Sequence, residues 1–393
     1  MRISNVVHPT RGRTDIRISD GRIVEIAAAL AAHDNEPGLD GQGALMLPGF
    51  VDAHTHLDKT LLGLPWHPHT AGPNVSDRIQ FERETLRTLT INPRKQSEHL
   101  LRHMLARGTT SIRTHVDIVP EIGLRHFHAV AQTRAHCQDL MDVQIVAFPQ
   151  LGVMRAPGTL DLLREALGSG AEVVGGLDPI SIDQDPKGQL DALFTLAEQF
   201  GAEVDIHLHD RGEAGAITID MIAQRTATLG LGGRVTVSHA FCLGDAETAR
   251  QRQLIDTLAR HNIAIMTHGP SAGIPSPPVR RLHEAGVRVF CGSDGVRDSW
   301  GPLNTGDMLE RAFIVSYLNG FRDDAGLELA LDMATYTGAD VLGIEHYGLE
   351  VGCHADLVLV RAANRAEAVV AHPVREVVVK RGKVVARHGQ CTV

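Results

Sequence analysis

Short apolar runs alternate with longer amphipathic stretches through the middle of the chain. Eight apolar runs are candidate strands: residues 47–56, 109–118, 142–150, 172–178, 203–209, 235–240, 263–268 and 287–294. Helix-like stretches lie between them, for example at residues 93–107, 160–167, 189–199, 216–229 and 246–260. Apolar strands that alternate with helices predict a parallel sheet covered on both faces.

Eight strand–helix units favour an α/β fold of the closed (β/α)₈ TIM-barrel type. An open, doubly wound parallel sheet is the alternative architecture. Such sheets often carry a glycine-rich phosphate-binding turn after the first strand, and no such turn follows residues 47–56. The barrel is therefore the expected fold of the middle segment.

The two ends of the chain have a different pattern. Alternating segments flank a turn at Asp20-Gly21, and a similar hairpin pattern surrounds Arg381-Gly382 near the other end. We therefore expect a small β-sandwich domain built from both termini, residues 1–46 and 345–393. The barrel domain is then expected to span residues 47–344.

Polar side chains of metal-binding type stand at the C-terminal ends of nearly all the candidate strands. In a barrel, this edge of the sheet carries the active site. In chain order, the strand-end residues are His54 and His56, residues 114–117, 148–150, 176–179 and 207–210, Ser238 and His239, Thr267 and His268, and Ser293 and Asp294.

The pair His54 and His56 is the most specific of these signals. Side chains two residues apart on a strand point to the same face, so both imidazoles can reach one metal ion. His207 from the fifth strand and Asp294 from the eighth would complete a ligand set suited to one divalent ion, Zn²⁺ or Fe²⁺. Such an ion makes hydroxide available from a bound water at neutral pH. We count Asp294 among the catalytic residues as well.

A hydrolase also needs groups that handle charge and protons. His239 on the sixth strand would lie beside the metal and could bind the metal-bound water or the developing oxyanion. A second group must carry a proton to the leaving group. Asp210, three positions after His207, and Glu213 are both candidates for this role, and the sequence leaves the choice open.

Three further strand-end histidines receive no role in the expected site. His115, His209 and His268 stand alone in their segments or beside a stronger candidate. An isolated barrel histidine is more often a hydrogen-bonded structural residue than a metal ligand. We therefore expect structural positions for all three.

Composition and charge narrow the class of protein. The chain is 43% hydrophobic and 22% charged, which is ordinary for a globular protein. Its net charge is −9 and it has no basic tract, which argues against a nucleic-acid partner. No segment approaches the ~18 apolar residues of a membrane span, and the start of the chain has no signal-peptide pattern. We expect a cytoplasmic protein that does not bind membranes.

Several motifs together carry a family resemblance over nearly the whole length. They are PGFVDAHTHLDKT at residues 48–60, RTHVD at 113–117, IVAFPQ at 145–150, DIH at 205–207, VSH at 237–239, GSD at 292–294 and DSW at 298–300. This set resembles the amidohydrolase superfamily, in its cytosine-deaminase-like branch. The resemblance implies one metal held by His54, His56, His207 and Asp294, with His239 orienting the hydroxide. The fourth strand lacks the terminal lysine of dinuclear members.

The resemblance also implies substrate contacts. Gln150 matches the glutamine that reads the amide edge of a pyrimidine, and Trp300 matches a tryptophan that lines the same pocket. Lys59 and Asp178 resemble residues of the N-isopropylammelide hydrolases in this branch, where they face a triazine ring. The expected partner is therefore a small N-heterocyclic molecule.

Two positions depart from the cytosine-deaminase pattern. Asp210 stands where those enzymes carry glutamate, and Gly295 stands where they carry a second aspartate. Aspartate is one methylene shorter, which affects the proton transfer, and Gly295 leaves room in the pocket. These differences favour a larger or differently substituted ring than cytosine itself.

Together these features predict a metal-dependent hydrolase that deaminates a cytosine-like N-heterocycle, or removes an alkylamine from it. A metal-bound hydroxide would attack the ring carbon that bears the nitrogen. One alternative is a cyclic amidohydrolase that opens a ring amide, and another is a non-catalytic metal- or ligand-binding barrel. Members of this branch often assemble, so the resemblance allows a homo-oligomer.

Overall fold

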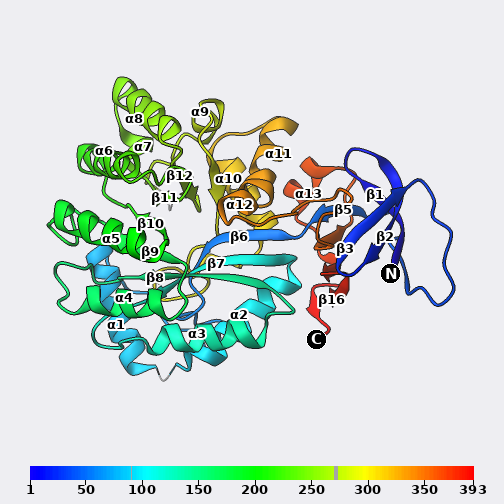
Figure 1. Ribbon diagram of the computed structural model, residues 1–393, viewed down its shortest axis with the longest axis horizontal. Coiled ribbons are helices and arrows are strands. Elements are labelled where there is room, and N and C mark those ends of the chain that lie inside the picture. The colour runs from blue at the N-terminus through cyan, green and yellow to red at the C-terminus, as the bar shows by residue number, and fades with distance from the viewer. Residues whose placement is uncertain (90, 270–272) are drawn as a thin grey trace.

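The computed structural model describes residues 1–89, 91–269 and 273–393, and its strands form two sheets (Figure 1). One sheet has eight parallel strands with helices outside it, and the other combines strands from both ends of the chain. The predicted α/β barrel with a small β-domain from the termini is confirmed. Of the helices in these ranges, none is long and apolar enough to cross a membrane.

The barrel strands follow one another in chain order. They are β6 (Phe50–Thr55), β7 (Thr109–Asp117), β8 (Asp142–Phe148), β9 (Val173–Leu177), β10 (Glu203–His207), β11 (Val235–Ser238), β12 (Ala264–Thr267) and β13 (Val289–Cys291). Most of their residues are buried, as expected for strands covered on both faces. A parallel bridge between Thr55 and Asp294 joins the end of the barrel to its beginning.

Helices cover the barrel and connect its strands. They are α2 (Pro93–Ala106), α3 (Arg125–His136), α4 (Thr159–Gly168), α5 (Pro186–Phe200), α6 (Gly212–Thr228), α7 (Cys242–Asp245), α8 (Thr248–Arg260), α9 (Val279–Glu284), α10 (Met308–Leu318), α11 (Asp324–Met333) and α12 (Tyr336–Val341). An additional helix, α1 (Val75–Thr88), lies in the long segment after β6, and α13 (Arg365–Ala371) lies near the C-terminus.

Helix α5 illustrates how local sequence sets these boundaries. The Asp185 side chain accepts a hydrogen bond from the Gly188 N–H, and Pro186 occupies the first turn. The helix ends at Gly201, whose φ of 62° lies in the left-handed region that favours glycine. Leu193 and Phe194 are among the side chains that the helix buries against the sheet. The boundaries therefore come from capping residues, and the orientation comes from the apolar face.

The second sheet joins the two ends of the chain. Its strands are β1 (Arg2–His8), β2 (Gly12–Ser19), β3 (Arg22–Ala27), β4 (Gly38–Asp40), β5 (Leu45–Pro48), β14 (Leu357–Val360), β15 (Arg375–Lys380), β16 (Lys383–Arg387) and β17 (Gln390–Cys391). The order is β17-β16-β15-β14-β5-β1-β2-β3, and β4 pairs with β1. Ile16 from one end and Val379 from the other lie in one apolar core. We propose two domains, residues 1–46 with 345–393 and residues 47–344. The expected strand 47–56 is divided between them, because Leu47 and Pro48 belong to β5 of the terminal sheet and Phe50–Thr55 form β6 of the barrel.

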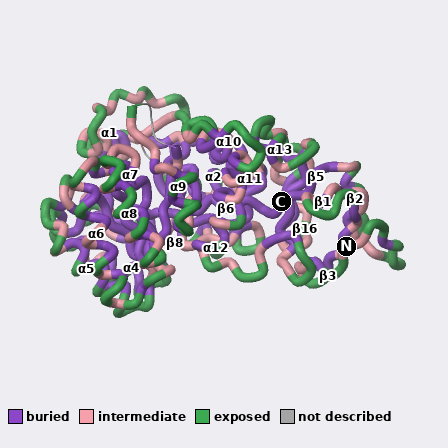
Figure 2. Tube along the Cα trace, turned by 90° about the horizontal axis from the view of Figure 1, so that it is seen from above, coloured by how far each residue is buried: buried purple, intermediate pink, exposed green. Residues whose placement is uncertain are grey.

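A buried lysine connects the two sheets. The side chain of Lys380 in β15 is 1% exposed, and its Nζ lies 2.7 Å from a carboxylate oxygen of both Asp142 and Asp356. It also donates to the Thr110 carbonyl at 3.1 Å. Thr110 and Asp142 lie at the N-terminal ends of the barrel strands β7 and β8. This cation therefore holds the terminal sheet against that end of the barrel. Buried residues occur in both the barrel and the terminal sheet (Figure 2).

Candidate metal centre and active site

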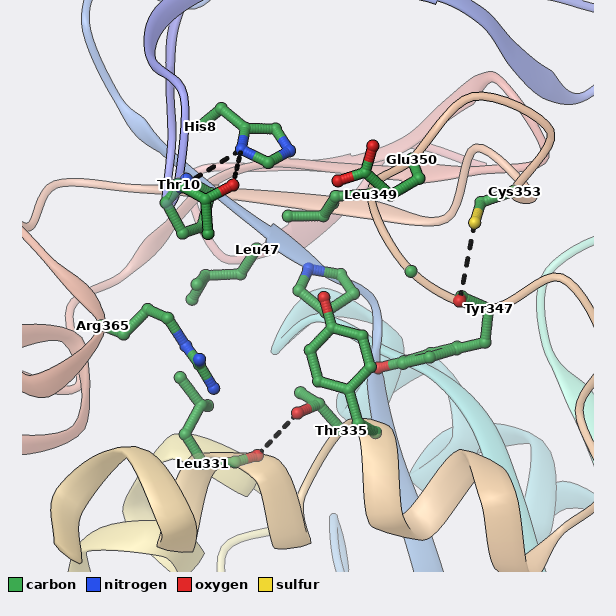
Figure 3. Close-up of a pocket in the computed structure, with 14 residues that line it drawn as sticks. His8, Thr10, Leu47, Leu331, Thr335, Tyr347, Leu349, Glu350, Cys353 and Arg365 are labelled. Atoms are coloured by element: carbon green, nitrogen blue, oxygen red, sulfur yellow. Dashed lines mark hydrogen bonds between the residues drawn. The ribbon is translucent and has the colours of Figure 1, made fainter. Parts of the chain in front are cut away.

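Two cavities are considered as candidates for the functional site. One lies where the terminal sheet meets α11 and α12, next to the start of β6, and Leu47, Tyr347 and Arg365 line it (Figure 3). Its charged groups have protein partners: Arg365 contacts Asp332, and Glu350 contacts Arg11. The other cavity lies beyond the C-terminal ends of the barrel strands, where barrels place their active sites.

The barrel cavity is small and partly open: about 330 Å³ of space between atoms, including open solvent, lies beyond the strand ends. Polar and aromatic side chains dominate its wall. The lining residues are His56, Lys59, Phe148, Gln150, Leu177, His207, His209, His239, Asp294, Asp298 and Trp300. The structure therefore brings most of the predicted site residues together around one small space.

The four predicted ligands form one compact group. The ligand atoms of His54, His56, His207 and Asp294 all lie within 4.8 Å of one another. The Asp294 Oδ1 is 3.2 Å from the His56 Nε2 and 3.7 Å from the His54 Nε2. Metal–ligand bonds of about 2.0–2.1 Å at tetrahedral angles would separate ligand atoms by about 3.3 Å. The spacing therefore fits a single divalent ion.

Unsatisfied nitrogens support the same assignment. His54 and His207 are buried, yet the His54 Nε2 and both ring nitrogens of His207 lack hydrogen-bond partners among the described residues. Leaving buried polar atoms without partners costs about 1–3 kcal/mol each. A metal ion would satisfy one nitrogen on each ring. Burial also lowers the pKa of His54 and of His207, which favours the neutral imidazole that binds metals.

A chain of hydrogen bonds orients His54. The Ser238 hydroxyl donates to the Asp205 Oδ1 at 2.6 Å and lies 3.1 Å from the His54 Nδ1. Because the Ser238 hydroxyl donates its hydrogen bond to Asp205, its oxygen accepts a hydrogen bond from the His54 Nδ1–H. The Nε2 then keeps its lone pair for a metal ion. Partners of this kind fix the tautomer and the orientation of metal-binding histidines.

Two site residues have a left-handed backbone. The φ angle is 70° at His239 and 60° at Asp294, which is uncommon for residues other than glycine. Backbone hydrogen bonds hold both residues in place. The His239 N–H donates to Met266, and the Asp294 N–H donates to His54 at 2.8 Å. Such conformations occur preferentially at functional sites, where the surrounding structure maintains them.

His239 lies beside the group of candidate metal ligands, and its role in binding the developing oxyanion stays a prediction. Its ring centroid is 5.2 Å from that of His54 and 4.9 Å from that of His207. Its Nε2 has no hydrogen-bond partner within the described ranges. This nitrogen is therefore available to a bound molecule.

Lys59 is buried at the cavity wall within an ionic cluster. Its Nζ lies 3.0 Å from Asp117 and 3.1 Å from Glu82, and Glu82 also accepts a 2.6 Å hydrogen bond from the Trp300 indole. Asp58, the neighbour of Lys59, accepts instead from His126. Although burial opposes the charged form, Asp117 and Glu82 raise the pKa of Lys59. A cation is thus fixed at the wall of the cavity.

Gln150 adds a neutral polar group to the wall. It is 4% exposed, and its Nε2 has no hydrogen-bond partner in the part of the chain that the structure describes. A buried amide without a partner is costly, so the position suits a ligand acceptor. Gln150 and Lys59 thus present two donors to one small space.

Asp178 contacts His209, a histidine of the cavity wall. It is fully buried, and its Oδ2 is 2.8 Å from the Nδ1 of His209. The backbone N–H groups of His209 and Asp210 also donate to this carboxylate. Burial alone would lower the pKa of His209, but Asp178 raises it above its usual value. In this geometry the Asp178 carboxylate contacts His209, and the expected substrate contact of Asp178 stays a prediction.

The structure does not bring the two predicted proton carriers to the cavity. Among the described residues, the cavity wall includes neither Asp210 nor Glu213. Asp210 lies near the Ser181 N–H at 3.4 Å, and burial followed by the Asp178 charge raises its pKa. The Glu213 side chain is 66% exposed at the start of α6 and lies 3.4 Å from Arg250.

His209 is the site residue that sequence reasoning missed. It follows His207 by two positions, which is the same spacing that identified His54 and His56. That spacing was the available signal, because residues two apart on an extended segment share a face. Glu82 was also missed, and no motif around it links α1 to the barrel site.

The chain matches known proteins, and the sequence model of the family described as "Amidohydrolase family" matches its residues 38–386. N-isopropylammelide isopropyl amidohydrolase of Pseudomonas sp. strain ADP is 34% identical over 384 residues, 95% of this chain and 93% of that protein. The structure of N-isopropylammelide isopropylaminohydrolase from Burkholderia multivorans ATCC 17616 superposes with a TM-score of 0.96 and 46% identity, over 100% of this chain and 99% of that one.

A more distant structure retains the same architecture. The 5-methylcytosine deaminase of Klebsiella pneumoniae, solved with 5-fluorocytosine, has a TM-score of 0.87 and 27% identity, over 98% of this chain and 97% of that one. The match of the family description over most of the chain and the full-length relative at 34% identity agree. The chain therefore belongs to the amidohydrolase family.

Proposed function

We propose that this protein is a metal-dependent hydrolase that removes an amine from a ring carbon of a small N-heterocycle. The single observation that carries the proposal is the compact group of His54, His56, His207 and Asp294. His56, His207 and Asp294 of this group line a small polar cavity. The 46% identical relative is named for releasing isopropylamine from N-isopropylammelide, which makes alkylamino triazines the first substrate class to test.

The proposed metal is one divalent ion, Zn²⁺ or Fe²⁺, held by these four side chains. Imidazole and carboxylate ligands suit both ions. When bound, such an ion lowers the pKa of a coordinated water toward neutrality and so supplies the nucleophile. The surrounding protein then has to position the ring, stabilise the charge that develops on it and deliver a proton to the leaving nitrogen.

We propose His209 as the group that delivers this proton. Its Nδ1 is bound to the buried Asp178, so its Nε2 is the nitrogen left for the substrate. The His209 ring lies in the cavity wall and stacks on His239 with a centroid separation of 4.4 Å. Asp210 and Glu213, the candidates from the sequence, stand as the alternatives that mutation distinguishes.

His239 would stabilise the developing negative charge. Its unpartnered Nε2 and its place beside His54 and His207 support this role. A donor that is already positioned before the reaction costs little reorganisation and contributes strongly in a water-poor site. Removing one such donor typically costs about 10²–10³ in kcat.

Substrate recognition would come from two donors and one aromatic face. The Gln150 Nε2 and the Lys59 Nζ can donate to ring carbonyl oxygens, and the Trp300 ring can pack against the heterocycle. Lys59 lies 5.9 Å from the Trp300 ring centre, so both reach the same part of the wall. An oxo-substituted triazine or pyrimidine matches this combination of donors.

The test is amine release by protein loaded with Zn²⁺ or with Fe²⁺. The substrates are N-isopropylammelide, other alkylamino and amino triazines, cytosine derivatives and pterins. We expect isopropylamine or ammonia together with a ring product that retains its closed ring. A product heavier than its substrate by one water would identify the ring-opening alternative. Fully metal-loaded protein that converts none of these compounds would favour the non-catalytic binding alternative.

A further inference from the structure

A second group of metal-type ligands lies directly beside the first. It consists of His239, His268 and Asp294, whose ligand atoms lie within 4.8 Å of one another. The Nδ1 atoms of His239 and His268 are 3.1 Å apart, and the His268 Nδ1 is 4.0 Å from the Asp294 Oδ2. These residues come from the ends of β11, β12 and β13, the last three strands of the barrel.

The spacing is close to that of a metal site. Ligand atoms around a tetrahedral ion with bonds of about 2.0–2.1 Å lie about 3.3 Å apart. The histidine pair matches this value, and the carboxylate needs to approach by less than one ångström, a distance of ~0.7 Å. The side chains of His268 and Asp294 are 16% and 26% exposed, so an ion can reach them from the cavity.

The contact between the two histidines has an electrostatic requirement. Both rings present the Nδ1 atom to each other. Two lone pairs at this distance repel, so the contact needs either a proton on one nitrogen or a cation between them. A cation between the rings would use both Nδ1 atoms as ligands. The His239 Nε2 would take no part in binding this ion.

Asp294 connects the two groups through different oxygens. Its Oδ1 faces His54 and His56, whereas its Oδ2 faces His268. A carboxylate in this arrangement can bridge two ions, and bridged ions in two-metal sites lie about 3.5–4 Å apart. The second group is therefore continuous with the first and shares one of its ligands.

We propose that His239, His268 and Asp294 form a second, weaker divalent-metal site that fills when zinc is in excess and inhibits the enzyme. It has three protein ligands, one of them shared, against four in the first site, which accounts for the order of filling. Nitrogen ligands favour Zn²⁺ over Mg²⁺ or Ca²⁺. The inhibition rests on the proposed function, because the second ion would engage His239, the residue proposed to stabilise the oxyanion, and Asp294, a proposed ligand of the first ion.

The test measures metal binding before activity. Protein carrying one equivalent of Zn²⁺ is titrated with more Zn²⁺ and followed by calorimetry, with elemental analysis after equilibrium dialysis. We expect wild type to bind a second equivalent more weakly than the first. His268→Ala and His268→Asn should both lose the second equivalent and keep the first. The asparagine variant retains a polar group that can contact His239, which separates loss of a ligand from loss of packing.

His388→Ala is the matched control. This histidine side chain is 75% exposed near the C-terminus, and its removal should leave both equivalents in place. Binding of only one equivalent by wild type at every zinc concentration would overturn the proposal. So would a second equivalent that persists in His268→Ala. Both results are independent of substrate, so they remain readable if the proposed reaction is not observed.

Activity gives the second readout once a substrate is known. Excess Zn²⁺ should inhibit wild type and His388→Ala, and this inhibition should disappear in His268→Asn. Equal inhibition of wild type and His268→Asn would place the inhibitory ion elsewhere and overturn the assignment.

Discussion

The Nδ1 of His209 lies 2.8 Å from the Oδ2 of Asp178, and this buried pair places an imidazole at the wall of the barrel cavity. The same carboxylate accepts a backbone hydrogen bond from His209 at 2.5 Å. Asp178 therefore fixes both the ring and the chain that carries it. An ionised partner of this kind sets the tautomer of a histidine and leaves its other nitrogen for chemistry.

The first prediction concerns proton transfer. Replacing His209 with asparagine should lower kcat by about 10²–10⁴, the usual contribution of a general acid or base. Asp178→Asn should also lower kcat, because the ring loses its ionised partner. Asp210→Asn and Glu213→Gln should change kcat by less than ~10-fold, since neither lines the cavity among the described residues. Steady-state amine release, with metal content measured for each variant, gives the comparison.

The opposite ranking would restore the expectation drawn from the sequence. If Asp210→Asn abolishes turnover while His209→Asn retains it at full metal content, the carboxylate carries the proton. The ring of His209 would then serve only to position its neighbours.

The second prediction concerns metal removal. Chelation should abolish amine release and lower Tm, because an ion that binds only the folded protein stabilises it by about 2.7 kcal/mol at a concentration 100-fold above its Kd. Adding Zn²⁺ or Fe²⁺ back should restore both properties. His54→Ala and His207→Ala should retain less metal than wild type after dialysis. A Tm that is the same with and without chelator would argue against an ion at this position.

The third prediction concerns the buried cation at the cavity wall. Lys59→Met should lower the free energy of unfolding by about 3–5 kcal/mol, the usual cost of breaking a buried ion pair. The loss arises because Glu82 and Asp117 remain buried without their partner. Urea denaturation measures the change, and kcat/KM should fall as well because a substrate donor is removed.

Lys187→Met provides the matched control for this variant. Its side chain is 80% exposed and pairs with Asp191 on the surface of α5, so the change should stay within about 0.5 kcal/mol. Adding Glu82→Gln to Lys59→Met should recover part of the lost stability. Equal losses from the two lysine variants would contradict the burial argument.

The fourth prediction concerns acid stability at the junction of the two sheets. Burial alone would raise the pKa of Asp142, but Lys380 and then Arg381 lower it below its usual value of 3.8. The carboxylate therefore contributes stability above pH 3.8, and this contribution is lost as the pH falls through the lower pKa of the folded state.

Asp142→Asn tests this contribution. The variant should be less stable than wild type at neutral pH by about 0–1 kcal/mol, because the Asp142 side chain is 41% exposed. The difference in unfolding free energy should persist down to the usual aspartate pKa and shrink at more acidic pH. A difference that stays constant across the acidic range would show that the charge of Asp142 is not its source.

Sequence reasoning could place the candidate metal ligands together because the barrel topology gathers strand ends. His54, His207 and Asp294 are far apart in the chain, yet parallel strands place their C-terminal ends on one edge. For Asp178 the substrate contact stays a prediction, and what the sequence did not indicate is its contact with His209. The backbone of Asp178, with φ of 31°, is left-handed just after β9, and its carboxylate lies 2.8 Å from the His209 Nδ1. No local pattern predicts that turn for an aspartate, and the substrate contact was expected from the family resemblance alone.

Glu82 shows a different limit. Glu82 lies in α1, in the long segment after β6, and its carboxylate contacts Lys59. The strand–helix repeat of the barrel does not fix the distance between these two residues. The apolar spacing of α1 can place a helix but cannot say which part of the barrel mouth it covers. Contacts of this kind come from tertiary packing alone.

The bridge between Thr55 and Asp294 also bears on how the protein is made. Thr55 donates its hydroxyl proton to the Asp294 carbonyl across 239 positions of sequence, at the junction that closes the barrel. A nascent chain that has emerged only through β12 carries His54, His56 and His207 but still lacks Asp294. The segment around residue 294 must leave the ribosome before these four candidate ligands can meet, so barrel closure and assembly of the group depend on the same segment.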